Sequence, residues 1–453
     1  MIDLQPLVNK TVPFKFKGAE LRLDLSHALF SSFDIDVGTR LLLKAVGRDE
    51  VLAGARRILD AGTGVGVIAL AMAKAFPEAE VTASDRDLLA CAFAERNRAR
   101  NKAPNLVSRP GLLGLDAVEI PALSGGGAVA GGGAVAGGGA VAGGPALPSG
   151  SDGRYDFILS NIPAKAGAPV IEAFLRDAVR RLLPGGRIGV VIVKPLVEAC
   201  LGWIEAAGLE IVNTERGSGH MAWVLAPRAA AAASAAPESA GVGPGAAAAP
   251  SGPLALAGQD LGVYVRRRGR FKCGEASYEA NGYWGLPDFD TVGFAPRVAA
   301  DLAERVLAGS LVRDALVVNP GLGHFPLWLA KRAAPERLCA ASRDLLQLAG
   351  TGANLAALTG RKPSYRALDA LRLDEEAQAS FDLIAEFLDA VPEYDWIGPL
   401  WGRALGLLKT GATFVLVGTP TELQRAEKRR PAGLRLLGEK RRKGFAAAAW
   451  RRE

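Results

Sequence analysis

Cysteine and histidine are scarce in this sequence, which has four cysteines and three histidines among 453 residues. The cysteines are scattered and have no paired spacing of the kind that disulfide frameworks or zinc sites require. The histidines are equally isolated, so we expect packing or surface roles for them and no metal site. Without a disulfide framework, the expected compartment is a reducing one, the cytoplasm.

The chain also lacks a continuous apolar run of membrane-spanning length that is free of charges and helix breakers. Its first residues, Met1 to Pro6, do not show the charged-then-apolar pattern of a secretory signal. We therefore expect no membrane partner. Apolar residues make up 49% of the composition, which allows sizeable cores, and the length suits two to three domains.

Two segments are too simple in composition to build a core. Residues 125–144 repeat Gly-Gly-Gly-Ala-Val-Ala three times and predict a mobile insert at about 123–150. Residues 229–252 are rich in Ala, Pro, Gly and Ser and predict a flexible linker. The sequence therefore predicts one domain over 1–228 and a second over 253–453.

The most informative stretch is Asp60-Ala61-Gly62-Thr63-Gly64-Val65-Gly66. It follows a short apolar run and precedes a helical run, which is the order strand, glycine turn, helix. Glycines let the backbone approach a ligand closely where side chains would clash. Asp85 ends the next apolar run, near the spacing at which an acid meets ribose hydroxyls. This pattern predicts a nucleoside site, and a turn that only packs helix on strand is the alternative.

A later apolar strand ends in Ser160-Asn161-Ile162-Pro163-Ala164. An amino nitrogen conjugated to a ring is a poor nucleophile. An Asn side-chain oxygen and the next backbone carbonyl can accept both of its hydrogens and aim its lone pair. We therefore assign catalytic roles to Asn161, Ile162 and Pro163, in a site for an amino or amide nitrogen. The alternative interpretation is an Asn-initiated turn at a strand end.

These two motifs resemble those of class I S-adenosylmethionine-dependent methyltransferases. The segment from Phe33 to Leu43 narrows the resemblance to the small-domain group, which includes the tandem-domain guanine-N2 ribosomal RNA methyltransferases. The resemblance covers about residues 10–228. It implies S-adenosylmethionine as cofactor and no metal. The cofactor-binding residues that it implies are Thr39, Asp60, Gly62, Thr63, Gly64, Gly66, Asp85 and Asp116.

The sequence departs from the Asn-Pro-Pro-aromatic motif of that group at two positions. Ile162 replaces the first proline, which a backbone carbonyl contact can tolerate. Ala164 replaces the aromatic residue that would stack on a flipped base, and this leaves the exact methylated base or residue open. Two alternative functions stay open as well: a protein glutamine N-methyltransferase, and a non-catalytic RNA-binding or ribosome-assembly factor.

The second half of the chain repeats the first. Ser342-Arg343-Asp344-Leu345-Leu346 matches Asp85-Arg86-Asp87-Leu88-Leu89. A repeat of this length, with strands and helices alternating in both halves, predicts an α/β protein of two tandem doubly wound, Rossmann-like domains. The second domain is expected to be degenerate. Its replacements are expected to be Asn319 for Asp60, Phe325 for Gly66, Ser342 for Asp85 and Phe387 for Asn161.

Positive charge gathers in the second half. Residues 421–453 hold eleven basic and four acidic residues, which accounts for the whole net charge of +7. A second cluster is Arg266-Arg267-Arg268-Gly269-Arg270-Phe271-Lys272. Positive fields of this kind attract phosphate backbones, although a solvated face is the alternative. Charge and resemblance together predict a methyltransferase acting on a guanine amino group of ribosomal RNA, with RNA as partner; a monomer is consistent with the sequence.

Overall fold

The computed structural model describes residues 3–114, 153–228, 260–358 and 364–453. In the first part the elements are β1 (Lys10–Phe16), β2 (Ala19–Leu25), α1 (Val37–Val46), α2 (Val51–Gly54), β3 (Arg57–Ala61), α3 (Val67–Ala75), β4 (Glu80–Asp85), α4 (Leu88–Arg100), β5 (Leu106–Pro110), β6 (Tyr155–Asn161), α5 (Ala168–Arg180), β7 (Leu182–Val193), α6 (Val197–Ala206), β8 (Leu209–Arg216) and β9 (His220–Pro227). Short 3₁₀ turns are η1 (Gln5–Leu7), η2 (Ala164–Ala166) and η3 (Lys194–Leu196).

The second part has the elements η4 (Gly262–Tyr264), β10 (Val265–Cys273), β11 (Ala276–Tyr283), α8 (Phe294–Val306), β12 (Asp314–Val318), α9 (His324–Arg332), β13 (Arg337–Ser342), α10 (Leu345–Ala357), β14 (Ser364–Asp369), η5 (Ala370–Glu375), β15 (Phe381–Phe387), α11 (Ile397–Leu407), β16 (Leu408–Gly418), α12 (Pro420–Lys428), β17 (Leu434–Arg442) and β18 (Phe445–Arg452). The Gly-rich insert, Asp116 and the linker at 229–252 lie outside the described residues. The predicted domain limits therefore stay predictions.

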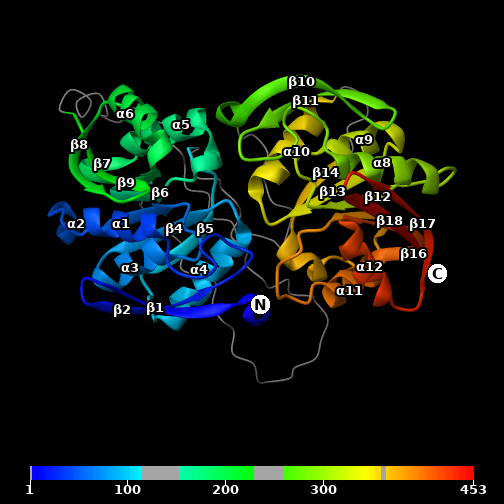
Figure 1. Cartoon of the computed structure of the whole chain (residues 1–453), viewed down its shortest axis with the longest axis horizontal. Coiled ribbons are helices and arrows are strands. Elements are labelled where there is room, and N and C mark those ends of the chain that lie inside the picture. Colours follow the sequence, from blue (N-terminus) through cyan, green and yellow to red (C-terminus); the bar gives the residue numbers. More distant parts are fainter. Residues whose placement is uncertain (1–2, 115–152, 229–259, 359–363) are drawn as a thin grey trace, which may run out of the picture.

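Each part forms a seven-stranded sheet flanked by helices (Figure 1). The strand order is β5-β4-β3-β6-β7-β9-β8 in the first and β14-β13-β12-β15-β16-β18-β17 in the second. The two orders describe the same topology. Strand β9 is antiparallel to both of its neighbours, β7 and β8, and β18 is antiparallel to β16 and β17. The prediction of two tandem Rossmann-like copies is confirmed.

A two-stranded ribbon accompanies each sheet, β1–β2 in the first copy and β10–β11 in the second. Equivalent asparagines attach the ribbons to their copies. Asn97 accepts from the backbone N–H of Asp24 at 2.8 Å and donates to its carbonyl at 3.0 Å. Asn354 makes the same pair of bonds to Asn281 at 2.8 Å and 3.0 Å. The spacing from Asp87 to Asn97 and from Asp344 to Asn354 therefore reflects a shared three-dimensional contact.

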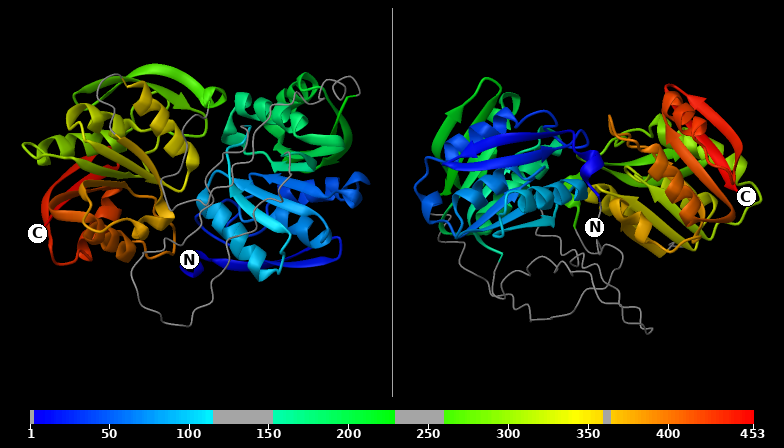
Figure 2. Two further views of the ribbon diagram at one scale, coloured as in Figure 1. Left: turned by 180° about the vertical axis from the view of Figure 1, so that it is seen from behind. Right: turned by 90° about the horizontal axis from the view of Figure 1, so that it is seen from below.

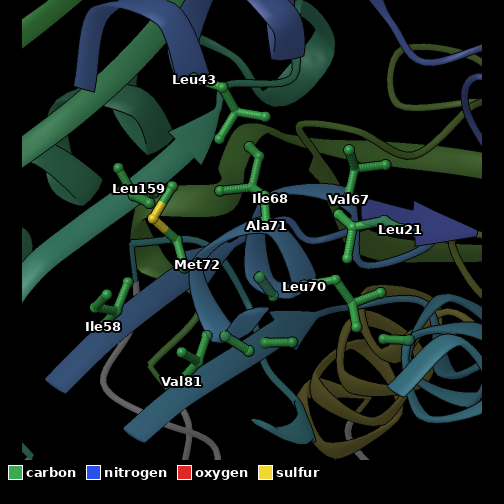
Figure 3. Close-up of a cluster of buried hydrophobic side chains, with 14 of the residues drawn as sticks. Leu21, Leu43, Ile58, Val67, Ile68, Leu70, Ala71, Met72, Val81 and Leu159 are labelled. Carbon is green, nitrogen blue, oxygen red and sulfur yellow. The ribbon is translucent and has the colours of Figure 1, made fainter. Parts of the chain in front are cut away.

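The core of the first copy surrounds α3, whose residues from Val67 to Ala73 are all apolar and buried (Figure 3). Such a helix must be enclosed on all its faces. Helix α3 contacts both the sheet and the β1–β2 ribbon, which covers the side that the sheet leaves open. The labelled core side chains are Leu21, Leu43, Ile58, Val67, Ile68, Leu70, Ala71, Met72, Val81 and Leu159.

The two copies join through equivalent segments, the ones that the sequence repeat matched. The backbone N–H of Leu88 donates to the carbonyl of Arg343 at 2.8 Å, and that of Leu345 donates to Arg86 at 3.0 Å. Each arginine also faces the acid of the other copy, in the pairs Arg86–Asp344 at 3.3 Å and Arg343–Asp87 at 3.7 Å. The contact is thus isologous within one chain. Figure 2 shows the copies side by side, with the C-terminus far from the contact.

One part of the sequence-based alignment is wrong by two residues. In the sheets, Arg57 pairs with Glu80 as Asp314 pairs with Arg337, so β12 begins where β3 begins. The counterpart of Gly66 is therefore Gly323; both precede a helix with positive φ, 91° and 95°. Phe325 lies inside α9, and the counterpart of Asp60 is Val317 instead of Asn319. The pairings of Ser342 with Asp85 and of Phe387 with Asn161 agree with the strand positions.

Candidate active site

The two sequence motifs meet where the strand order of the first sheet reverses. Strands β3 and β6 are parallel neighbours, so the glycine loop and the Asn-Ile-Pro turn leave the sheet at the same edge. The hydroxyl of Ser160 donates to the carbonyl of Ala61 at 2.8 Å and ties the two strand ends together. The crevice beyond such a reversal point is where doubly wound folds bind ligands.

The glycine loop is fixed by the neighbouring strand β4. The N–H groups of Gly62 and Thr63 donate to the carbonyl of Ser84 at 2.8 Å and 2.9 Å. Gly62 and Gly64 have φ of +79° and +55°, a backbone conformation that favours glycine. A Cβ atom added to either would meet nothing within 4 Å, so this face of the loop is open. At Gly66 it would meet Ala94 at 3.2 Å, because here the loop packs on α4.

Asp60 lies buried beneath this loop. The Thr63 hydroxyl and the Ala69 N–H both donate to its Oδ2, at 2.6 Å and 3.0 Å. Its Oδ1 is buried and has no hydrogen-bond partner among the described residues. Burial raises the pKa of this carboxyl to about 7. Asp60 therefore shapes the loop from below and leaves one acceptor unsatisfied.

The pH dependence of folding should report this buried carboxyl. Because the pKa rises from 3.8 to about 7 on folding, the folded state binds the proton more tightly between these values. The contribution of Asp60 to the free energy of unfolding therefore falls as the pH rises from about 4 to about 7. In Asp60→Asn, which keeps an acceptor for Thr63 and Ala69, this part of the dependence should vanish. Urea unfolding at about pH 5 and pH 8 checks this prediction. The free energy of unfolding of the variant should rise relative to that of wild type at the higher pH. The same difference between variant and wild type at both pH values would contradict the raised pKa.

Asp85 stands at the carboxyl end of β4, beside the open face of the loop. One carboxylate oxygen accepts from the Gly64 N–H at 2.9 Å, and the other accepts from the Asp87 N–H at 2.9 Å. Burial is the largest cause that raises the pKa of this carboxyl, opposed by these bonds and by the Arg86 charge. Asp85 thus connects the glycine loop to the segment that contacts the second copy.

Asn161 is held in one orientation by the segment before α1. Its Nδ2 donates to Oδ2 of Asp36 at 2.9 Å and to Oγ1 of Thr39 at 3.0 Å. A carboxylate only accepts, so the amide nitrogen must face Asp36, and the side-chain oxygen must face away from it. Asp36 also caps α1 by accepting from the Thr39 N–H at 3.0 Å. Asp36 was not among the residues assigned from the sequence; its position three residues before Thr39 was the available signal.

The turn after Asn161 is rigid at both ends. The N–H of Ile162 donates to the carbonyl of Val191 on β7 at 3.1 Å, and the Ile162 side chain is buried. The carbonyl of Pro163 accepts from the Ala166 N–H at 2.9 Å, which closes η2. These bonds set the direction of the Ile162–Pro163 peptide relative to Asn161.

A cavity of 2730 Å³ runs over these groups. Thr39, Gly62, Thr63, Gly64, Asp85, Asn161, Ile162 and Pro163 all line it, together with Asp36. Asp60 and Gly66 do not line the cavity, because they lie behind the glycine loop. The second copy supplies part of the wall, with Tyr264, Arg266 and Trp284. No sequence pattern places these three residues at this site, because their position depends on how the copies dock.

The equivalent place in the second copy has lost the two acids and the amide of the first. Val317, Ser342 and Phe387 stand where the first copy has Asp60, Asp85 and Asn161. The ring of Phe387 contacts that of Phe325 edge-on, with 5.7 Å between centroids. The glycine loop keeps its shape there, and Oε1 of Gln347 accepts from the Gly321 N–H at 3.1 Å, the bond that Asp85 makes to Gly64 in the first copy.

No group of three or more His, Cys, Asp or Glu residues within the described ranges is arranged to hold a metal ion. None of the helices that the structure describes is both long and apolar enough to cross a bilayer.

The comparisons with known proteins agree with this geometry. Residues 20–111 match the family described as the Methyltransferase small domain. The chain is 28% identical over 176 residues to the Ribosomal RNA small subunit methyltransferase C of Pasteurella multocida, covering 38% of this chain and 42% of that protein. It is 35% identical over 117 residues to the Ribosomal RNA large subunit methyltransferase G of Pseudomonas putida, covering 25% and 30%. The chain thus spans less than half of the length of either relative.

A solved structure matches the whole chain. The 16S rRNA N2 methyltransferase of T. thermophilus, determined with AdoMet and guanosine, superposes with a TM-score of 0.60 at 16% identity and covers 99% of both chains. The chain therefore has the fold of a tandem Rossmann-like methyltransferase. Within it, the match to the Methyltransferase small domain, over residues 20–111, falls in the first copy.

Proposed function

We propose that the protein is an S-adenosylmethionine-dependent N-methyltransferase that modifies a guanine amino group of ribosomal RNA in the cytoplasm. The observation that carries the proposal is the side-chain oxygen of Asn161, which is fixed as an acceptor beside the open glycine loop. The names of the ribosomal RNA methyltransferase relatives and the guanosine in the T. thermophilus structure support the choice of substrate.

The first copy has groups that fit the cofactor. The open faces of Gly62 and Gly64 would admit its methionine part, and the Asp85 carboxylate would accept from its ribose hydroxyls. Asp60 does not line the cavity and supports the loop from beneath through Thr63 and Ala69. Thr39 lines the same cavity from α1. When bound, the sulfonium supplies an electrophilic methyl group.

The Asn-Ile-Pro turn acts on the nitrogen that receives the methyl group. The side-chain oxygen of Asn161 accepts one amino hydrogen and the carbonyl of Ile162 accepts the other. Pro163 keeps that carbonyl in place. These two bonds strengthen as the nitrogen becomes tetrahedral, so they lower the barrier more than they stabilise the bound substrate. Positioning beside the methyl donor contributes the rest.

A strain that lacks this protein tests the proposal. Mass mapping of its ribosomal RNA should reveal one guanine without the N2-methyl group that the parent strain carries. The purified protein should restore that group on ribosomal particles from the deletion strain. A glutamine methyl group that is lost from a ribosome-associated protein, with the RNA unchanged, would show that the substrate is a protein. An assembly defect without any lost methyl group would favour a non-catalytic assembly factor. The absence of an aromatic ring at Ala164 is the observation that supports this alternative.

A further inference from the structure

Arg266 of the second copy is held in a fixed position between two aromatic rings. Its guanidinium carbon lies 4.3 Å from the ring centroid of Trp284 and 3.5 Å from that of Phe289. A guanidinium stacked on aromatic rings in this way loses little further freedom when it binds a ligand. The guanidinium is therefore packed against both rings.

The same ring of Trp284 reaches the active site of the first copy. A Cβ atom added to Gly167 would lie 2.5 Å from the Trp284 ring, so this ring rests directly on the Gly167 backbone. Gly167 follows η2 and is six residues from Asn161. Arg266 and Trp284 both line the cavity that contains Asn161. Figure 1 shows one end of the β10–β11 ribbon close to α5, and η4 contacts that helix.

Arg266 has no acidic partner within ion-pair distance among the residues that the structure describes. It is exposed, and the exposed residues Arg268, Arg270 and Lys272 follow it at alternate positions along β10. The pairing of β10 with β11 is irregular at Arg266 and regular from Arg267 onward, so Arg268, Arg270 and Lys272 share one face of the strand and recur about every 6.6 Å. Phe271 and Cys273, on the other face, are buried. These three cations thus form a row along the ribbon, and Arg266 lies at the start of the same strand, where it lines the cavity.

We propose that Arg266 binds a backbone phosphate next to the target nucleotide, and that the second copy thereby completes the RNA site of the first. This inference rests on the proposed function. A phosphate offers acceptors to the N–H groups of the guanidinium, and the row of Arg268, Arg270 and Lys272 matches successive phosphates of one strand. The degenerate copy is then a substrate-binding domain that acts at the catalytic cavity itself.

Steady-state methylation of particles from the deletion strain, with the full-length protein at several salt concentrations, tests this inference. Arg266→Gln should raise the KM for particles about tenfold and leave kcat and cofactor affinity within twofold of wild type. The dependence of log kcat/KM on log salt should also become shallower by about one unit. The matched control is Arg267→Gln, an exposed arginine of the same strand that does not line the cavity; it should change the KM less than twofold.

The outcomes separate this inference from the proposed function. If wild type methylates RNA and the Arg266 and Arg267 variants behave alike, or if the salt dependence of the Arg266 variant is unchanged, the phosphate contact is wrong while the function stands. If Arg266→Gln lowers kcat at unchanged KM, the residue acts on the chemistry and the proposal is equally overturned. If wild type methylates no RNA at all, both proposals fail together. Thermal unfolding checks that both variants are folded at the assay temperature: Arg266→Gln should lower the Tm somewhat, because it removes the contacts with the Trp284 and Phe289 rings, and Arg267→Gln should leave the Tm unchanged.

Discussion

Replacing Asn161 with alanine should lower kcat for methyl transfer by about 10²- to 10³-fold, the usual cost of removing one oriented polar group from a transition state. Its side-chain oxygen would no longer accept from the amino group. The KM for substrate and the affinity for the cofactor should change little, because neither depends mainly on this acceptor. Single-turnover methylation of deletion-strain particles, together with calorimetric titration of the cofactor, measures the two effects separately.

Asn213→Ala is the matched control for this variant. Asn213 also contacts α1, donating to the carbonyl of Ala45 at 2.9 Å, but it does not line the cavity. Its loss should cost some stability and leave kcat near the wild-type value. Equal rates for Asn161→Ala and wild type would reject the acceptor role and, with it, the mechanism proposed for the Asn-Ile-Pro turn.

Replacing Asp85 with alanine should weaken the binding of S-adenosylmethionine about 5- to 150-fold, which corresponds to about 1–3 kcal/mol for polar groups left unmatched. Two causes act together. The ribose hydroxyls lose their acceptor, and the Gly64 N–H loses the bond that holds the glycine loop at 2.9 Å. Calorimetric titration of the full-length chain with the cofactor gives the dissociation constants.

The control for Asp85 comes from the repeat itself. Ser342 occupies the equivalent position at the end of β13 in the second copy. Ser342→Ala should leave cofactor affinity unchanged if only the first copy binds it. A weaker affinity in Ser342→Ala, with Asp85→Ala unaffected, would move the cofactor to the second copy and reverse the assignment of the two copies.

Local features of the sequence were enough to predict the fold class and the two motifs that line part of the cavity. The strand, the glycine loop and the acid that ends the next strand follow one another within a single βαβ unit, so Gly62, Gly64 and Asp85 could be assigned from turn chemistry and spacing. The repeated Arg-Asp-Leu-Leu segments predicted two equivalent copies. The residue register of the second copy could not be read in this way, since similar side chains such as Val317 and Val318 permit more than one alignment.

Contacts between distant parts of the chain decided the rest. The sequence by itself determined that an asparagine ends β6 and that a glycine loop precedes α3. Only the tertiary structure decided which way Asn161 faces, because Asp36 is 125 residues away in the chain. The tertiary structure also places Arg266 and Trp284 at the cavity, through the contact between Trp284 and Gly167, which no sequence pattern predicts. Turn geometry and periodicity are properties of neighbouring residues, whereas the direction of an amide and the wall of a shared cavity depend on packing across the whole molecule.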